Sequence, residues 1–249
     1  MLRILSSDHK KARVIVVVLF WISTFFTSLC FGSTAQEAYD AGQKYAKRGY
    51  YTKAMEEFNT VRNYYRDDPL AVMSELAIAD MYFKKAEWDL ARYSYDDFRR
   101  RYPRHEQIDY VTYQIGMSLY KKSPSFSGRD QKWTRQTIGV WRGFEEQYPN
   151  SEYLSDVKEK QQECLERLAK KEFQIAEFYA RRKAWEAVRR RAEGLVQDYP
   201  QSEYLPQGYA LLVSAYMELD DKEAASAALE RLGASDADQA EKLRKKYFN

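Results

Sequence analysis

The sequence feature that most constrains the fold is a short motif that occurs twice almost unchanged. Residues 148–153 read YPNSEY, residues 199–204 read YPQSEY, and a third Tyr-Pro pair stands at residues 102–103. Proline lacks a backbone N–H and disfavours helical geometry in the residue before it, so each Tyr-Pro pair predicts the end of a helix. A repeated sequence with a helix end at each recurrence predicts an array of similar helical units.

Small and aromatic residues follow one another in a fixed order upstream of these pairs. Small residues allow the two helices of a hairpin to approach closely, and aromatic side chains fill the space between their turns. The spacing is that of a tetratricopeptide repeat. The five predicted repeats contain Gly42, Tyr45, Gly49, Tyr51, Ala54, Phe58 and Val61; Ala79, Tyr82, Ala86, Trp88, Ala91, Tyr95 and Phe98; Gly116, Leu119, Thr137, Trp141 and Phe144; Ala176, Tyr179, Lys183, Trp185, Val188, Ala192 and Leu195; and Val213, Tyr216, Ala225, Leu229 and Leu232.

The predicted fold class is all-α, an α-solenoid of about five tetratricopeptide repeats with a C-terminal capping helix. Because a single repeat cannot bury its apolar face, stacked repeats must share one core. A generic amphipathic bundle is the alternative. The stretch SPSFSGRDQK at 123–132 predicts a loop. Residues 153–182, which include neither Gly nor Pro, predict one long connecting helix. We expect two binding modules: 36–152 with repeats one to three, and 153–249 with the long helix, repeats four and five and the cap. Further helices are predicted near 36–48, 52–66, 70–85, 88–101, 107–122, 133–147, 185–198, 205–219, 222–232 and 236–247.

The N-terminus has the pattern of an export signal. Four basic residues (Arg3, Lys10, Lys11 and Arg13) precede the uncharged apolar run 14–31. Three interpretations remain open for this leader, which we place at 1–35. A signal peptidase could cleave after Ala35, or a lipoprotein signal could leave Cys30 as the acylated first residue, although Leu29 is larger than such signals prefer. The run also approaches the ~20 residues of an uncleaved membrane anchor.

Charge and residue usage exclude several classes of function. Outside residues 1–29, Lys+Arg and Asp+Glu balance at 36 each, which disfavours a nucleic-acid partner. The two cysteines, Cys30 and Cys164, cannot form a four-thiolate zinc site, and His105 has no second ligand at metal-binding spacing. No phosphate-binding loop or catalytic signature is present. We therefore expect a non-catalytic protein without metal or cofactor.

Several stretches go beyond general repeat spacing. They are YPRH at 102–105 followed by IDYV at 108–111, the insert containing RDQ at 129–131, and the segment 167–200. Together they make the chain, over about residues 36–232, resemble the BamD family of outer-membrane protein assembly factors. Two features differ from that family's pattern: Leu29 before the candidate acylated cysteine, and residues 65–70, which lack an aromatic-rich Pro segment.

The resemblance implies a periplasmic scaffold at the outer membrane, lipid-anchored if Cys30 is acylated. It implies partners in the β-barrel assembly complex: the barrel-assembly subunit, bound through its periplasmic domain by the C-terminal repeats, and accessory lipoproteins. Unfolded outer-membrane proteins would bind the N-terminal repeats. It also implies that Arg191, with Glu193 beside it, contacts the barrel-assembly subunit. The planar guanidinium of arginine suits such a contact because it can pair with a carboxylate through two hydrogen bonds.

A client-peptide groove is expected on the first helices of repeats one to three, where aromatic and lysine side chains would face the concave surface. Such a surface suits an extended peptide that ends in an aromatic residue and a carboxylate. The alternative is that these aromatic rings pack between repeats. The candidate groove residues are Tyr39, Lys47, Phe83, Lys84, Tyr113 and Tyr120, and the same faces include Asp80, Tyr110 and Met117.

Two rival functions remain. The first is a periplasmic repeat protein that coordinates cell-wall synthesis with envelope constriction; such proteins usually have an N-terminal coiled coil, and no heptad pattern separates the leader from Gly42. The second is a helical-repeat enzyme that cleaves glycans, which would need a further compact domain with a catalytic glutamate.

Overall fold

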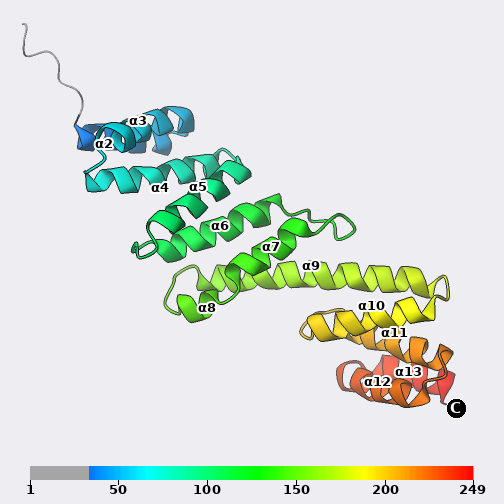
Figure 1. The fold of residues 1–249 in the computed structure, drawn as a ribbon. Coiled ribbons are helices and arrows are strands. Elements are labelled where there is room, and N and C mark those ends of the chain that lie inside the picture. Colours follow the sequence, from blue (N-terminus) through cyan, green and yellow to red (C-terminus); the bar gives the residue numbers. More distant parts are fainter. Residues whose placement is uncertain (1–33, 249) are drawn as a thin grey trace, which may run out of the picture. The chain divides into compact units, whose positions relative to one another are not determined.

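The computed structural model describes residues 34–248, and every regular element in that range is a helix. The all-α prediction is therefore confirmed for this part of the chain (Figure 1). The helices are α2 (Ala35–Lys47), α3 (Tyr51–Tyr64), α4 (Pro69–Lys84), α5 (Trp88–Arg101), α6 (Ile108–Lys122), α7 (Lys132–Trp141), α8 (Phe144–Gln147), α9 (Leu154–Ala180), α10 (Trp185–Asp198), α11 (Leu205–Glu218), α12 (Lys222–Ser235) and α13 (Ala237–Tyr247).

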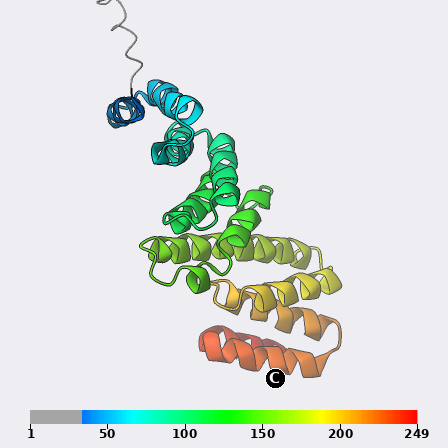
Figure 2. The same cartoon turned by 60° about the vertical axis from the view of Figure 1, so that its left-hand side comes forward.

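The chain divides into two compact units, Met1–Ser74 and Glu75–Asn249, and the boundary between these ranges falls within the sequence of α4. In the first unit α2 packs against α3, and in the second each helix from α9 to α13 packs against the next one along the chain. Figure 2 shows this C-terminal succession below the long helix α9. The division differs from the predicted boundary at 152/153, which concerned binding surfaces and stays a prediction.

The same turn joins the two helices of four hairpins. Its geometry explains the second small position of the repeat, which we had expected to allow close approach of the helices. Gly49 has φ 79°, and the equivalent residues Ala86, Lys183 and Asp220 have φ 58°, 57° and 61°. This left-handed geometry favours glycine because a Cβ atom is strained there. The second small position of the repeat is thus set by the backbone of the turn and not by helix approach.

The first small position does serve close helix packing. A Cβ atom on Gly42 would lie 2.6 Å from the ring of Phe58, and one on Gly116 would lie 2.1 Å from Nε1 of Trp141. Phe58 and Trp141 are each only 1% exposed. In these two repeats the second helix places a large ring directly against a glycine of the first.

The single helix predicted at 133–147 is instead two helices, α7 and the short α8. Gly143, with φ 74°, lies between them in the left-handed region. The break was not predicted because apolar residues continue through the segment at helical spacing. Other predicted helices agree with the structure to within a few residues, including α9 for the long helix predicted at 153–182.

The same Gly→Ala substitution should have opposite effects at two sites four residues apart. Gly139 lies inside α7, and no atom lies within 4 Å of the place that an alanine methyl group would take, so Gly139→Ala should raise the free energy of unfolding by about 0.5–1 kcal/mol. Gly143→Ala should lower it by about 1 kcal/mol because φ is positive there. Urea denaturation of both variants checks this, and equal signs would contradict it.

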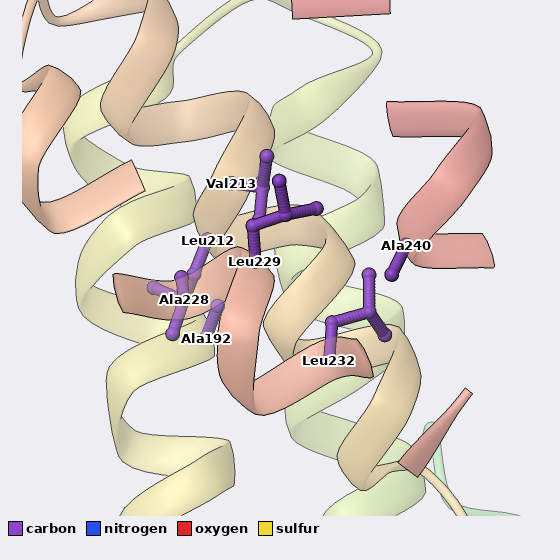
Figure 3. Close-up of a cluster of buried hydrophobic side chains, with 7 residues drawn as sticks. All are labelled: Ala192, Leu212, Val213, Ala228, Leu229, Leu232 and Ala240. Carbon is purple, nitrogen blue, oxygen red and sulfur yellow. The ribbon is translucent and has the colours of Figure 1, made fainter. Parts of the chain in front are cut away.

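Buried apolar side chains of α10, α11, α12 and α13 form the C-terminal core, as Figure 3 shows. Ala240 is the residue that α13 contributes to this cluster, while Lys245 and Lys246 of the same helix are exposed to solvent. The last helix therefore covers the fifth repeat, as predicted for a capping helix. The cluster consists of Ala192, Leu212, Val213, Ala228, Leu229, Leu232 and Ala240.

The helical domain begins one residue before the predicted end of the leader. Thr34 caps α2: its hydroxyl accepts a hydrogen bond from the Glu37 backbone at 3.2 Å, and the Glu37 carboxylate accepts one from the Thr34 backbone at 2.9 Å. Ala35 is buried. Cleavage after Ala35 would remove this cap, so the cap favours interpretations in which Thr34 is retained. Cys30 lies outside the described residues. Among residues 34–248 no helix is long and apolar enough to cross a membrane.

Candidate partner and client surfaces

Arg191 lies on α10 and forms an ion pair across to α9. Its Nη1 donates to Oε2 of Glu172 at 3.0 Å, and its side chain is 47% exposed. An exposed ion pair of this kind contributes little to stability, about 0–1 kcal/mol. The guanidinium of Arg191 can therefore leave Glu172 and pair with another carboxylate at little cost in folding free energy. The structure thus places Arg191 on an accessible surface between α9 and α10.

Glu193 points to a different neighbour. Its carboxylate accepts hydrogen bonds from Nη1 of Arg189 at 2.8 Å and from the hydroxyl of Tyr216 on α11, also at 2.8 Å. Partial burial and this hydrogen bond to a carboxylate raise the pKa of Tyr216 to about 12. Arg191 and Glu193 are therefore not brought together: Arg191 pairs toward α9, whereas Glu193 ties α10 to α11.

Three of the candidate groove residues meet around one apolar cluster in the second unit. Phe83, Tyr113 and Tyr120 pack against the buried cluster of Met117, Trp141, Phe144 and Val157. Phe83 also lies edge-on to Trp88, with ring centres 5.0 Å apart. The structure thus brings these three predicted groove residues together, and all three remain partly exposed.

The two tyrosines of this group are bonded to the long helix. The hydroxyl of Tyr113 donates to Asp156 at 2.7 Å, and its ring stacks on Tyr153 at 4.8 Å. The hydroxyl of Tyr120 donates to Glu163. Burial and a carboxylate acceptor raise the pKa of both tyrosines. These contacts fix α6 on α9, so each ring presents to a client only the part that this packing leaves exposed.

The remaining groove candidates do not join this group in the described contacts. Lys84 is exposed in the last turn of α4. Tyr39 and Lys47 belong to the first unit, where Tyr39 is 8% exposed and packs against Phe58 with ring centres 5.4 Å apart. Lys47 is exposed in the last turn of α2. Tyr39 is therefore a core residue of its repeat.

Sequence reasoning did not identify a polar cluster that joins α4, α5 and α6. The carboxylate of Asp80 accepts hydrogen bonds from the hydroxyls of Tyr95 at 2.6 Å and Tyr110 at 2.8 Å, and Gln114 donates to Tyr110 at 3.0 Å. Burial raises the pKa of Asp80, in spite of the two tyrosine hydrogen bonds and nearby Lys84, which lower it. Tyr110 belongs to the IDYV segment, one of the stretches that go beyond general repeat spacing. Through Asp80, its hydroxyl helps to hold α4, α5 and α6 together.

Asp80→Asn should make stability less dependent on pH. A carboxyl group whose pKa is higher in the folded state stabilises the fold fully below its unfolded pKa of about 4, and this contribution disappears as pH rises through the folded value. Asparagine keeps an oxygen that can accept from Tyr95 and Tyr110 but never ionises. The variant should therefore gain stability relative to wild type as pH rises above about 4. Urea denaturation at stepped pH measures the difference, and a constant difference would contradict the assignment.

The histidine and the cysteine of the helical domain have structural contacts. His105 accepts a hydrogen bond through Nδ1 from the Gln107 backbone at 3.2 Å, and its ring lies edge-on to Phe98. Cys164 is buried, and burial raises the pKa of its thiol to about 11. Within residues 34–248 no group of three or more His, Cys, Asp or Glu side chains could hold a metal ion.

Helical hairpins with one shared turn, Tyr-Pro helix ends and a covering C-terminal helix define a tetratricopeptide-type repeat protein. The YfiO family model, described as outer membrane lipoprotein, matches residues 32–232, and the chain belongs to this family.

Curated relatives have the same name in several bacteria. Outer membrane protein assembly factor BamD of Neisseria meningitidis serogroup B is 28% identical over 75% of this chain and 73% of the relative. BamD of Xylella fastidiosa strain 9a5c is 30% identical over 77% and 68%, and that of Pasteurella multocida is 27% identical over 84% and 86%. A solved structure, the complex of the TPR2AB domain of yeast Sti1 with pHSP90, is similar at a TM-score of 0.47 and 16% identity over 83% of this chain and 80% of that one.

Proposed function

We propose that this protein is a non-catalytic scaffold for assembly of outer-membrane β-barrel proteins. Family membership over residues 32–232 and relatives named as outer membrane protein assembly factors support the role. In this proposal the protein acts on the periplasmic face of the outer membrane, with accessory lipoproteins as further partners. Acylation of Cys30, if it occurs, would supply the membrane anchor.

The observation that carries the docking part of the proposal is the exposed Arg191–Glu172 pair. Only Nη1 of Arg191 engages Glu172, and the pair lies in the family-like segment 167–200. A carboxylate from the periplasmic domain of the barrel-assembly subunit would bind the same guanidinium, and desolvation at the interface would strengthen the new pair. Glu193 would act indirectly, by fixing α10 on α11 through Tyr216.

Client binding is proposed for the exposed edge of the aromatic group on α4 and α6. Phe83, Tyr113 and Tyr120 offer ring surface, and Lys84 supplies a cation at the end of α4. An unfolded outer-membrane protein with an aromatic C-terminal residue would find apolar surface and a partner for its carboxylate there.

The proposal is tested by purifying the mature chain from membranes in mild detergent and identifying the proteins that remain bound. Recovery of a large outer-membrane β-barrel protein with periplasmic domains is the expected result. Recovery of cell-wall synthesis enzymes without such a protein would favour the alternative, a repeat protein that coordinates cell-wall synthesis with envelope constriction. Hydrolysis of peptidoglycan by the purified chain would contradict the non-catalytic role.

A further inference from the structure

A second surface, on helices other than those that carry Arg191, has the form of a binding groove. It is an open groove of about 780 Å³ in the second unit, with walls from α5 and α7 and a floor from α6. The floor side chains Thr112, Ile115 and Leu119 line the groove, whereas Tyr113 and Tyr120, about a third of a turn away on α6, do not. The groove is therefore separate from the aromatic client surface proposed above.

The charges that line the groove are mostly positive. Its four cationic side chains (Arg92, Arg99, Lys132 and Arg142) face one acidic residue, Asp96. Arg99 pairs with Asp96 at 2.7 Å, so the single carboxylate is already engaged. Because the chain beyond residue 29 has balanced charge, this local excess of cations is a property of the groove and not of the whole protein.

Several of these cations have unused hydrogen-bonding capacity. Arg92 lies 3.8 Å from Asp96, beyond hydrogen-bond distance, and its Nε has no hydrogen-bond partner among the described residues. Lys132 and Arg142 are exposed, and no carboxylate lies within ion-pair distance of either in the described part of the chain. A buried donor without a partner is costly, so a carboxylate that entered here would relieve a cost as well as add an attraction.

Aromatic and apolar side chains indicate the kind of anion. Trp133, Tyr148 and Tyr93 line the groove together with Val140, and Tyr93 is 60% exposed. A free phosphate or carboxylate ion would leave these surfaces and most of the volume unused. A peptide that mixes acidic and apolar side chains would use both.

We infer that the groove between α5 and α7 binds an acidic, partly apolar peptide segment of a partner protein. The carboxylates of the segment pair with Arg92, Lys132 and Arg142, and its apolar side chains pack on Trp133 and Tyr93. Nucleic acid is the poorer match, because a nucleic-acid surface would be expected to extend its positive charge well beyond one groove.

One glycine allows the groove to be filled without disturbing the fold. Gly139 lines the groove, and no atom lies within 4 Å of where its Cβ would be. Gly139→Leu should therefore occupy the groove while α7 stays intact. Gly194 in α10 has the same open surroundings and lies outside the groove, so Gly194→Leu is the matched control.

The test measures binding of a fluorescein-labelled peptide of about ten residues that mixes Glu, Leu and Gly, by fluorescence anisotropy on the full mature chain. Wild type should bind it, and binding should weaken as salt rises. Gly139→Leu, and separately Lys132→Glu with Arg142→Glu, should each weaken binding at least about tenfold. Gly194→Leu and Lys170→Glu, an exposed lysine on α9, should bind as wild type does.

Any one of the following results would overturn the inference: no measurable binding by wild type, equal weakening by the control variants, or equal binding of a peptide with Gln in place of Glu. Competition by an oligothymidylate as effective as that by unlabelled peptide would also overturn it, because it would reveal a general anion surface. The circular dichroism spectrum of each variant verifies folding. The outcome is independent of Arg191, so failure here leaves the proposed docking function standing.

Discussion

Gly116→Ala is expected to destabilise the second unit severely, and a change at Trp141 should partly relieve the effect. The added Cβ would lie 2.1 Å from Nε1 and 2.2 Å from Cε2 of an indole that is 1% exposed. Trp141 cannot move away easily because Met117, Phe144 and Val157 surround it. Overpacking of this kind costs about 1–3 kcal/mol or more, and we expect the upper end of that range.

A double-mutant cycle separates this clash from a general loss of packing. Trp141→Leu alone should cost about 3 kcal/mol because it leaves a cavity. The combined variant should lose less than the sum of the two single losses, since the new methyl group enters the vacated space. Urea denaturation provides the free energies of unfolding. If the two losses in free energy of unfolding are additive, the indole of Trp141 is not the reason why glycine is required at position 116.

The helical repeats could be predicted from the sequence because local chemistry fixes them. Pro103, Pro149 and Pro200 follow helix ends because the proline ring removes a backbone N–H and disfavours helical geometry in the residue before it. The aromatic spacing identifies the packed faces of the helices. The fifth repeat has Asp220 at the left-handed turn position, where glycine would be favoured, yet its turn matches the others. The apolar positions on both sides form the C-terminal core, and they identify this repeat without a glycine in its turn.

The break at Gly143 shows the limit of that reasoning. Trp141 and Phe144 both belong to the repeat pattern, and helical spacing alone places them on one continuous helix. Both side chains are buried in one cluster with Val157 of α9. The interruption between them lies at Gly143, where φ is positive, and α7 and α8 both contact α9, which begins at Leu154.

The candidate surfaces were only partly predictable for the same reason. The pattern identified Tyr113 and Tyr120 as side chains of one helix face, and they do share an environment. It could not show that their hydroxyls donate to Asp156 and Glu163, because those pairings depend on where α9 lies. Likewise the sequence could not distinguish the arginines of the run 189–191 from one another. Arg189 pairs with Glu186 within α10, whereas Arg191 pairs with Glu172 of α9.

Arg191→Glu should nearly abolish docking on the barrel-assembly subunit. The substitution would place a carboxylate next to Glu172 and opposite the partner's expected carboxylate, so attraction becomes repulsion on both sides. We expect a loss of about 100-fold in affinity, which corresponds to about 2.7 kcal/mol. Folding should be preserved, because the lost ion pair is exposed and contributes at most about 1 kcal/mol.

The neighbouring residue supplies the matched control. Arg190 is exposed, and none of the described residues forms an ion pair with it. Arg190→Glu makes the same change of charge one position away, so a loss of affinity through net charge alone would appear in both variants. A loss confined to Arg191→Glu would identify the contact itself.

The most direct test of the proposed scaffold role is therefore the affinity of the purified mature chain for the periplasmic domains of the barrel-assembly subunit, measured by calorimetry for wild type, Arg191→Glu and Arg190→Glu. The account predicts binding by wild type and by Arg190→Glu, and a loss of about 100-fold for Arg191→Glu. No binding by wild type would contradict the scaffold role, and equal affinities of all three proteins would contradict docking through α9 and α10.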